Sequence, residues 1–175
     1  FKQSEDYQHG ADEFHGVGCD MRVEEIRVDW EILDSWREDA EEMGIPQIRE
    51  FNRGDNFGNA YFQMNQRRGK RWSATSAYLK PVMSRRNLTV RTNTAVENLC
   101  LDLSDGKLSA KGVSACINGN EKVRFTARRE ILLSAGAVGS PQILQLSGIG
   151  SQKLLEDRGV KVNLDLPGVG ENLQD

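Results

Sequence analysis

The sequence predicts a mixed α+β or α/β fold, in which an antiparallel β meander with helices is joined to part of an α/β domain. Changes in hydrophobic period carry this prediction. Apolar residues recur every three or four positions in residues 29–43, as in an amphipathic helix, and every second position after residue 86, as in strands. The last third then reads as strand, small-residue turn, helix, helix and strand, which is typical of an α/β domain.

The composition is that of an ordinary globular protein and excludes two classes. Hydrophobic residues make up 38% of the 175 residues, and no apolar run approaches the roughly 18 residues that a membrane span needs. The formal net charge of −3 offers no broad basic field, which argues against a nucleic-acid partner. The local basic cluster is interpreted as a solvated loop; it consists of Arg67, Arg68, Lys70 and Arg71.

The cysteines and the two ends of the chain carry further expectations. Cys19, Cys100 and Cys116 are odd in number and far apart, so they imply no disulfide framework and favour a reducing compartment such as the cytoplasm. The first residues resemble neither an initiator segment nor a signal peptide, and the last residues lack a stop signal. We therefore expect an inner part of a longer chain.

The first half of the sequence predicts few regular elements. Residues 21–23 are the best candidate for an early strand, and residues 29–43 form the amphipathic helix, with Asp29 or Asp34 as its cap and Gly44 as its end. A long irregular region follows over residues 45–69. Ser73 is expected to cap a short helix over residues 74–79, which Pro81 ends. The stripe of the long helix consists of Leu33, Trp36, Ala40 and Met43.

The second half predicts the meander and then the α/β pattern. The expected strands lie at residues 88–90, 95–101, 108–117 and 122–133, the last as one long strand or as two joined by a bend. Turns are expected at Ser104-Asp105-Gly106 and Asn118-Gly119-Asn120. The apolar run at residues 131–133 indicates a strand buried on both faces. Ser140 and Pro141 suit the N-cap and first position of a helix that ends at Gly148 and Gly150. A helix over residues 152–158 and a strand over residues 160–164 complete the pattern.

The small residues 134–139 admit two interpretations. A strand that ends in small residues lets its backbone approach a flat ligand, because no branched side chain stands in the way. The next helix turns its unpaired N–H groups toward the same space, which suits a phosphate or sugar oxygens. Alternatively, the small side chains only allow the strand and helix to pack closely.

Standard nucleotide motifs are absent. Three G-x-G triplets begin at Gly16, Gly148 and Gly168, and none has the third glycine of G-x-G-x-x-G. No phosphate loop is present either, because Lys70 of Gly69-Lys70 is followed by Arg71. If the protein binds a dinucleotide, its main pyrophosphate loop must lie outside these residues.

Other chemistries have weaker support. His15 lies near Cys19 and Asp20, but no second Cys or His pair completes four zinc ligands, so no metal site is predicted. A serine hydrolase would need a G-x-S-x-G elbow, which is missing. The acidic residues are interpreted as a solvated helix face rather than a catalytic pair; they are Glu24, Glu25, Glu38, Glu41 and Glu42.

One long segment resembles a known family signature. Residues 134–150, SAGAVGSPQILQLSGIG, are similar to the second signature of the glucose–methanol–choline (GMC) oxidoreductases. Further segments resemble family elements in the expected order, and the resemblance is nearest to choline-dehydrogenase-like members. They are Phe14-His15-Gly16, Gly69-Lys70-Arg71-Trp72-Ser73, Ala77-Tyr78-Leu79-Lys80-Pro81, Asn87-Leu88-Thr89-Val90 and residues 166–175.

The resemblance implies an FAD-dependent enzyme that oxidises a primary alcohol by hydride transfer to the flavin. Residues 1–86 would be a segment of the substrate region, and residues 87–175 the β meander with part of the FAD-binding domain. The family's catalytic histidine and its partner lie near the C-terminus, so no catalytic residue is assigned here and His9 and His15 do not inherit the role. Which alcohol is oxidised, and whether oxygen is the acceptor, stays open.

The resemblance also implies cofactor contacts. Val96 matches the position whose backbone faces the adenine of FAD, and Ala135, Gly136 and Ala137 match the turn along the cofactor. Ser140 and Asn172 are further candidates. Two alternatives remain: a non-catalytic α/β interaction module, and a subunit completed by missing segments or by a partner chain.

Overall fold

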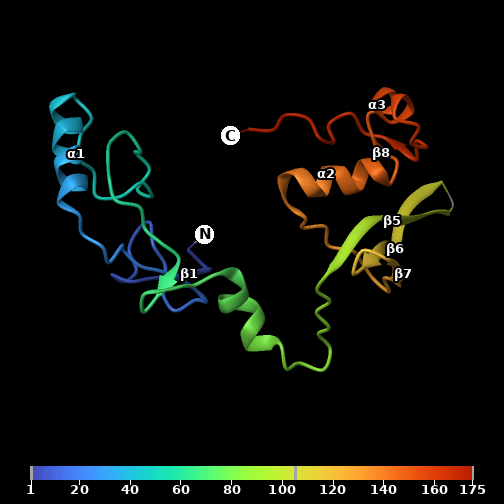
Figure 1. Ribbon diagram of the computed structural model, residues 1–175, viewed down its shortest axis with the longest axis horizontal. Helices are drawn as coiled ribbons and strands as arrows, with labels where there is room; N and C mark the ends of the chain where they lie inside the picture. The colour runs from blue at the N-terminus through green and yellow to red at the C-terminus, as the bar shows by residue number, and fades with distance from the viewer. Residues whose placement is uncertain (1, 105, 175) are drawn as a thin grey trace. The chain divides into compact units, whose positions relative to one another are not determined.

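The computed structural model describes residues 2–104 and 106–174, and the chain divides into two compact units, residues 1–90 and residues 91–175 (Figure 1). Both units contain helices and strands, which confirms the mixed fold. Within the described residues, every helix is too short or too polar to cross a lipid bilayer. The buried apolar side chains are Tyr7, Ala40 and Ala77 in the first unit, and Cys100, Ala115, Ile143, Ile149 and Leu155 in the second.

Two small sheets lie in the first unit. β1 (Glu5–Tyr7) pairs in parallel with β2 (Met21–Val23), which confirms the strand expected at residues 21–23. β3 (Gln66–Arg67) and β4 (Lys70–Arg71) form a hairpin, with Arg68 and Gly69 at positive φ in its turn. The basic cluster therefore belongs to a hairpin and not to a loop, although its side chains are exposed as expected.

Helix α1 (Glu31–Glu42) ends as predicted but begins differently. Gly44 follows it at φ +89, the left-handed conformation that closes many helices. Trp30 occupies the N-cap position with no side-chain cap, so neither Asp29 nor Asp34 has the expected role. Asp34 instead accepts a hydrogen bond from the Tyr61 hydroxyl at 2.7 Å.

Residues 74–82 correct a second prediction. A π-helical turn (Thr75–Leu79) runs directly into a 3₁₀ turn (Lys80–Val82), so Pro81 does not end the helical segment. Proline is tolerated there because it stands in the first turn of the 3₁₀ segment, where its missing N–H has no partner to lose. The Ser73 side chain does not cap this segment. Its backbone carbonyl instead accepts a hydrogen bond from the Ala77 N–H.

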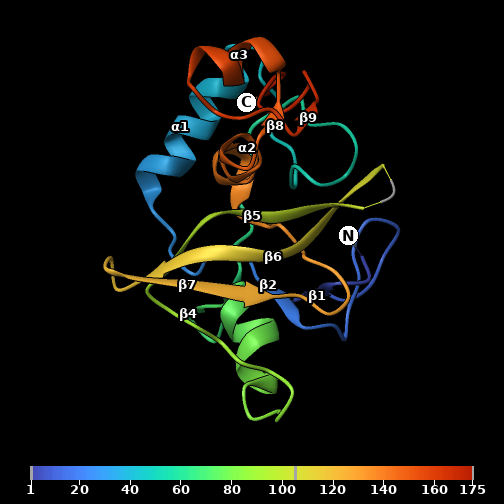
Figure 2. The same ribbon diagram turned by 90° about the vertical axis from the view of Figure 1, so that its right-hand side faces the viewer.

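A three-stranded antiparallel sheet forms the centre of the second unit (Figure 2). β5 (Thr94–Ser104), β6 (Lys107–Ile117) and β7 (Glu121–Thr126) pair in sequence order, which confirms the meander. Asn118 and Gly119 both have positive φ in the second turn, as a tight hairpin requires. The first turn contains Asp105, which lies outside the described residues.

Two of the strands expected in the meander are wrong in whole or in part. Residues 88–90 and 131–133 are not strands, and Leu132 is 83% exposed. The expected strand at residues 122–133 stops at Thr126, where the pairing with β6 ends at Gly112. An apolar run needs a neighbouring strand to bond its backbone groups, and the described residues supply none beyond this point.

The C-terminal elements pack on this sheet. α2 (Gly136–Leu146) lies against β5, where the Ser147 Oγ accepts from the Leu99 N–H at 2.8 Å and donates to the Ile143 carbonyl. β8 (Ile149–Gly150) and β9 (Leu164–Asp165) pair in parallel around α3 (Gln152–Asp157). Gly150 thus lies in a strand, and the strand expected at residues 160–164 forms only at its last residue and the one after it.

Gly112 allows β6 and β7 to approach each other. A Cβ at this position would lie 2.2 Å from the carbonyl oxygen of Phe125, a backbone atom that cannot move aside. We predict that Gly112→Ala lowers the free energy of unfolding by about 1–3 kcal/mol, the usual cost of overpacking. Thermal and urea denaturation followed by circular dichroism measure this loss.

Gly168→Ala is the matched control, because nothing lies within 4 Å of its added Cβ and its φ is not positive. Equal stability of the two variants would contradict the prediction.

Candidate functional site

The small-residue turn leads directly into α2. Gly136 has φ +87, so the chain enters the helix at this residue, and Ala135 precedes it. Ser140 is therefore inside the helix, and the prediction that it is the N-cap is wrong. Its Oγ reaches back and accepts a hydrogen bond from the Ala135 N–H at 3.0 Å. Glycine makes the earlier start possible because it adopts positive φ without a steric cost.

An open hollow of about 650 Å³ lies between the N-terminal half of α2 and the segment after β9. Gln145 holds the two walls together, because its Nε2 donates to the Val169 carbonyl at 3.1 Å. Gly170 has φ +85, and a Cβ there would lie 2.7 Å from that nitrogen. The lining residues are Ala137, Val138, Ser140, Pro141, Gln142, Leu144, Gln145 and residues 168–174.

The hollow brings together three of the six expected cofactor residues. Ala137, Ser140 and Asn172 line it, and Asn172 has φ +57. Ala135 and Gly136 lie in the turn just before these residues. Val96 is on β5, 38% exposed, and does not line the hollow. The six residues therefore stay predictions.

Sequence reasoning missed Gln145 and the loop that it holds. Gly168-Val169-Gly170 lacks the third glycine of a dinucleotide-binding motif, yet its backbone forms one wall of the hollow. The two glycines were the available signal, since they let a backbone approach a neighbour closely.

The chemistry of the hollow suits binding and not proton transfer. Its walls are small apolar groups, amides and backbone, and among the described residues that line it Glu171 alone is ionisable. The N-terminus of α2 adds N–H groups without helical partners and the positive end of the helix dipole. Such a wall fits a flat ring or the sugar and phosphate oxygens of a nucleotide.

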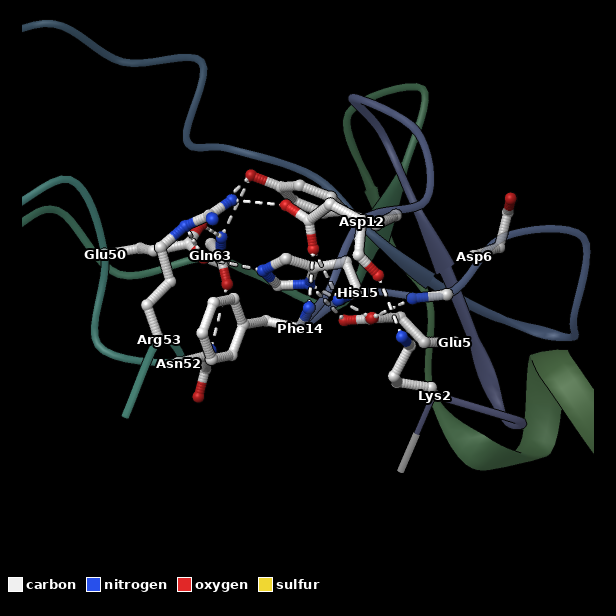
Figure 3. Close-up of polar contacts among 12 residues, drawn as sticks. Lys2, Glu5, Asp6, Asp12, Phe14, His15, Glu50, Asn52, Arg53 and Gln63 are labelled. Atoms are coloured by element: carbon white, nitrogen blue, oxygen red, sulfur yellow. Dashed lines mark hydrogen bonds and ion pairs between the residues drawn. The ribbon is translucent and has the colours of Figure 1, made fainter. Parts of the chain in front are cut away.

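A buried polar cluster lies in the first unit (Figure 3). His15 is fully buried and stands between Glu5 and Glu50, which are each 3% exposed. Both ring nitrogens face carboxylates. No group of three or more His, Cys, Asp or Glu residues suited to a metal ion occurs in residues 2–104 and 106–174.

One acidic residue corrects the interpretation of a solvated face. Glu24 is 4% exposed, and its carboxylate pairs with Arg22 at 3.2 Å and with Arg27 at 3.0 Å. Burial by itself would raise the pKa of Glu24, but hydrogen bonds from Arg27 and Arg22 outweigh it, so that pKa is lowered. Glu24 therefore belongs to the framework of the first unit.

A family model described as GMC oxidoreductase matches residues 2–175. The chain belongs to the GMC oxidoreductase family. This confirms the resemblance found in residues 134–150, and FAD is the cofactor of the family.

Known relatives agree with this membership. The GMC chain is 36% identical over its full length to mitochondrial choline dehydrogenase of Homo sapiens, of which it covers 29%. It is 37% identical, again over its full length, to the oxygen-dependent choline dehydrogenase of Photobacterium profundum and covers 30% of that protein. An FAD-dependent oxidoreductase from Chaetomium thermophilum matches 99% of the chain with a TM-score of 0.86 at 29% identity, and the chain covers 32% of it.

Gln145 gives a test of the hollow in this GMC chain. We predict that Gln145→Leu frees residues 168–170, because leucine keeps the helix but cannot donate to the Val169 carbonyl. The expected result is faster hydrogen exchange of the Val169 and Glu171 amides, by about tenfold for each 1.4 kcal/mol of lost local stability.

Gln142→Leu is the control, because Gln142 lines the same hollow without a hydrogen bond to that loop. Unchanged exchange in the Gln145 variant would show that other contacts hold the wall.

Proposed function

We propose that this chain forms a supporting wall of the flavin site in an enzyme that oxidises a primary alcohol. The observation that carries the proposal is the hollow beside α2, whose small-residue turn belongs to the segment shared with the family signature. The similarity to two choline dehydrogenases supports an alcohol, a CH–OH donor, as the substrate class.

The small residues of the turn bring backbone, and not side chains, to the cofactor. Ala135, Gly136 and Ala137 let the main chain lie along the flavin nucleotide, and the N–H groups at the start of α2 favour its oxygens. Asn172, on the opposite wall, offers an amide that bonds a sugar or ring oxygen. By the family resemblance, the backbone of Val96 would lie against the adenine. Bound FAD would supply the hydride acceptor for the oxidation of the alcohol.

The base that removes the hydroxyl proton is not among the described histidines. His15 is fully buried with both nitrogens engaged, and His9 pairs with Glu25 at 3.1 Å on the surface. A catalytic base must reach the proton that it abstracts. The chain therefore supplies binding surface, and we expect it alone neither to hold FAD tightly nor to oxidise an alcohol.

A titration can test whether the chain alone binds FAD tightly. Titration of the 175-residue chain with FAD, followed by calorimetry and flavin fluorescence, should show at most weak binding. Tight binding, or flavin reduction on addition of choline, would contradict this expectation.

A substitution in the hollow tests the cofactor wall in the intact flavoprotein. We predict that Ala137→Leu reduces FAD affinity by about tenfold or more, since a steric cost of about 1.4 kcal/mol has this effect. Ala137 has helical geometry and is exposed, so leucine is tolerated by the fold. The ratio of flavin to protein absorbance after dialysis measures the loss.

Lys153→Leu places the same side chain on the exposed surface of α3, away from the hollow, and serves as control. An intact protein without flavin absorbance, or an Ala137 variant that keeps its flavin, would favour a packing role for the turn.

A further inference from the structure

Both nitrogens of the buried His15 ring lie against carboxylate oxygens. Its Nδ1 lies 3.1 Å from Glu5 Oε2, and its Nε2 lies 2.6 Å from Glu50 Oε1. A neutral imidazole carries one N–H and one lone pair, so it would direct the lone pair at one of the two carboxylates. Only the imidazolium donates on both sides. With both carboxylates ionised, the geometry therefore favours the charged form of His15.

The surroundings satisfy both carboxylates as well. Glu5 also accepts from the Gly16 N–H at 3.0 Å, and Glu50 accepts from the Tyr7 hydroxyl at 3.2 Å and from the Gln63 amide (Figure 3). Buried charges are costly unless they are paired and hydrogen-bonded, and here each one is. The Tyr7 ring stacks on the imidazole with centroids 3.9 Å apart, which places an aromatic face against the cation.

The cluster carries a smaller net negative charge when His15 is protonated. The charged and titratable groups around the ring are Glu5 and Tyr7 from β1, Asp12 from the preceding turn, and Glu50 and Arg53 from the long loop. Arg53 pairs with both Asp12 and Glu50, so it compensates one of the carboxylates that flank its guanidinium. Loss of the His15 proton would leave Glu5 and Glu50 with too few cations.

The neighbouring groups do not change charge near neutral pH. Burial and then the charge of Glu50 raise the pKa of Tyr7. Burial would raise the pKa of Asp12, but hydrogen bonds from the His15 and Phe14 backbone and from Arg53 lower it to about 2. Arg53 keeps its proton throughout. A transition above the ordinary histidine pKa therefore reports His15.

The ring also connects distant parts of the sequence. Glu5 is 10 residues from His15 and Glu50 is 35 residues away, and Gln63 joins through its bonds to Glu50 and Tyr7. Gln63 in turn lines a cavity of about 440 Å³ together with Arg49 and Tyr61. The cluster thus fixes one wall of that cavity.

We propose that the proton on His15 is a buried clamp that joins residues 5–16 to residues 47–63 and positions Gln63 in the cavity wall. Loss of this proton as the pH rises releases the wall. His15 is a positioning residue that acts through Glu50.

The direction of the pH effect follows from the contacts. Burial by itself would lower the pKa of His15, but the hydrogen bonds and charges of Glu50 and Glu5 outweigh it, so that pKa is raised. A group with a raised folded-state pKa stabilises fully below the unfolded value, near 6.5, and this stabilisation disappears as the pH rises through the folded-state value.

Nitrogen NMR of the 175-residue chain labelled in histidine tests the clamp directly. His9 and His15 are the only histidines, and His9→Gln assigns the signals. We expect both His15 ring nitrogens to have imidazolium shifts at a pH just above the ordinary histidine pKa of about 6.5. The Gln63 side-chain amide should exchange faster once His15 loses its proton. A neutral His15 ring at that pH would overturn the proposal.

Glu50→Gln separates the clamp from simple packing, because glutamine keeps the shape and removes the charge. We expect the His15 titration to move to lower pH by at least one unit, and the Gln63 amide to lose protection. The Glu50 variant and the unmodified chain decide the question without a substitution at His15, which could prevent folding. His9→Gln is the control, because it breaks an exposed His–Glu pair and should leave both readouts unchanged. An unchanged His15 titration in the Glu50 variant would also refute the clamp.

Discussion

The imidazole of His15 between Glu5 and Glu50 is the contact on which the first unit depends, because this unit has few buried apolar side chains. Tyr7, Ala40 and Ala77 are its buried apolar residues among those described, and two of them are alanines. Alanine removes little apolar area from water, so the hydrophobic contribution is small. A buried polar network rigidifies a fold when every member is bonded, and it therefore replaces part of the missing core.

The second unit depends on a different kind of contact. Its sheet bonds its own backbone, and α2 is fastened to it at Ser147, which bonds to Leu99 and Ile143. Asn163 adds a bond to the Ser147 carbonyl at 2.9 Å. Because the C-terminal end of α2 is fixed in this way, the direction of its N-terminus is fixed too. The contacts of Ser147 at the C-terminal end of α2 therefore also fix the position of the small-residue turn and of the hollow beside it.

Local patterns predicted what local physics controls. The period of two located β5 and β6, Asn118-Gly119 marked a turn that needs two positive φ angles, and the period of the stripe located α1. Two predictions failed for separate reasons. Residues 131–133 looked like a buried strand, but apolar side chains do not supply the backbone partner that a strand requires. Ser140 looked like the N-cap of a helix that begins at Pro141, yet Gly136 allowed the helix to begin five residues earlier, at residue 136.

The sequence by itself determined the family, the FAD cofactor and most element types, because the signature at residues 134–150 and the hydrophobic periods are contiguous in the chain. Only the tertiary structure decided which side chains meet. Nothing local in the sequence pairs His15 with Glu50 across 35 residues, or Gln145 with the Val169 carbonyl across 24. Such contacts depend on how loops close in space, and loop closure is set by the summed packing of all the elements.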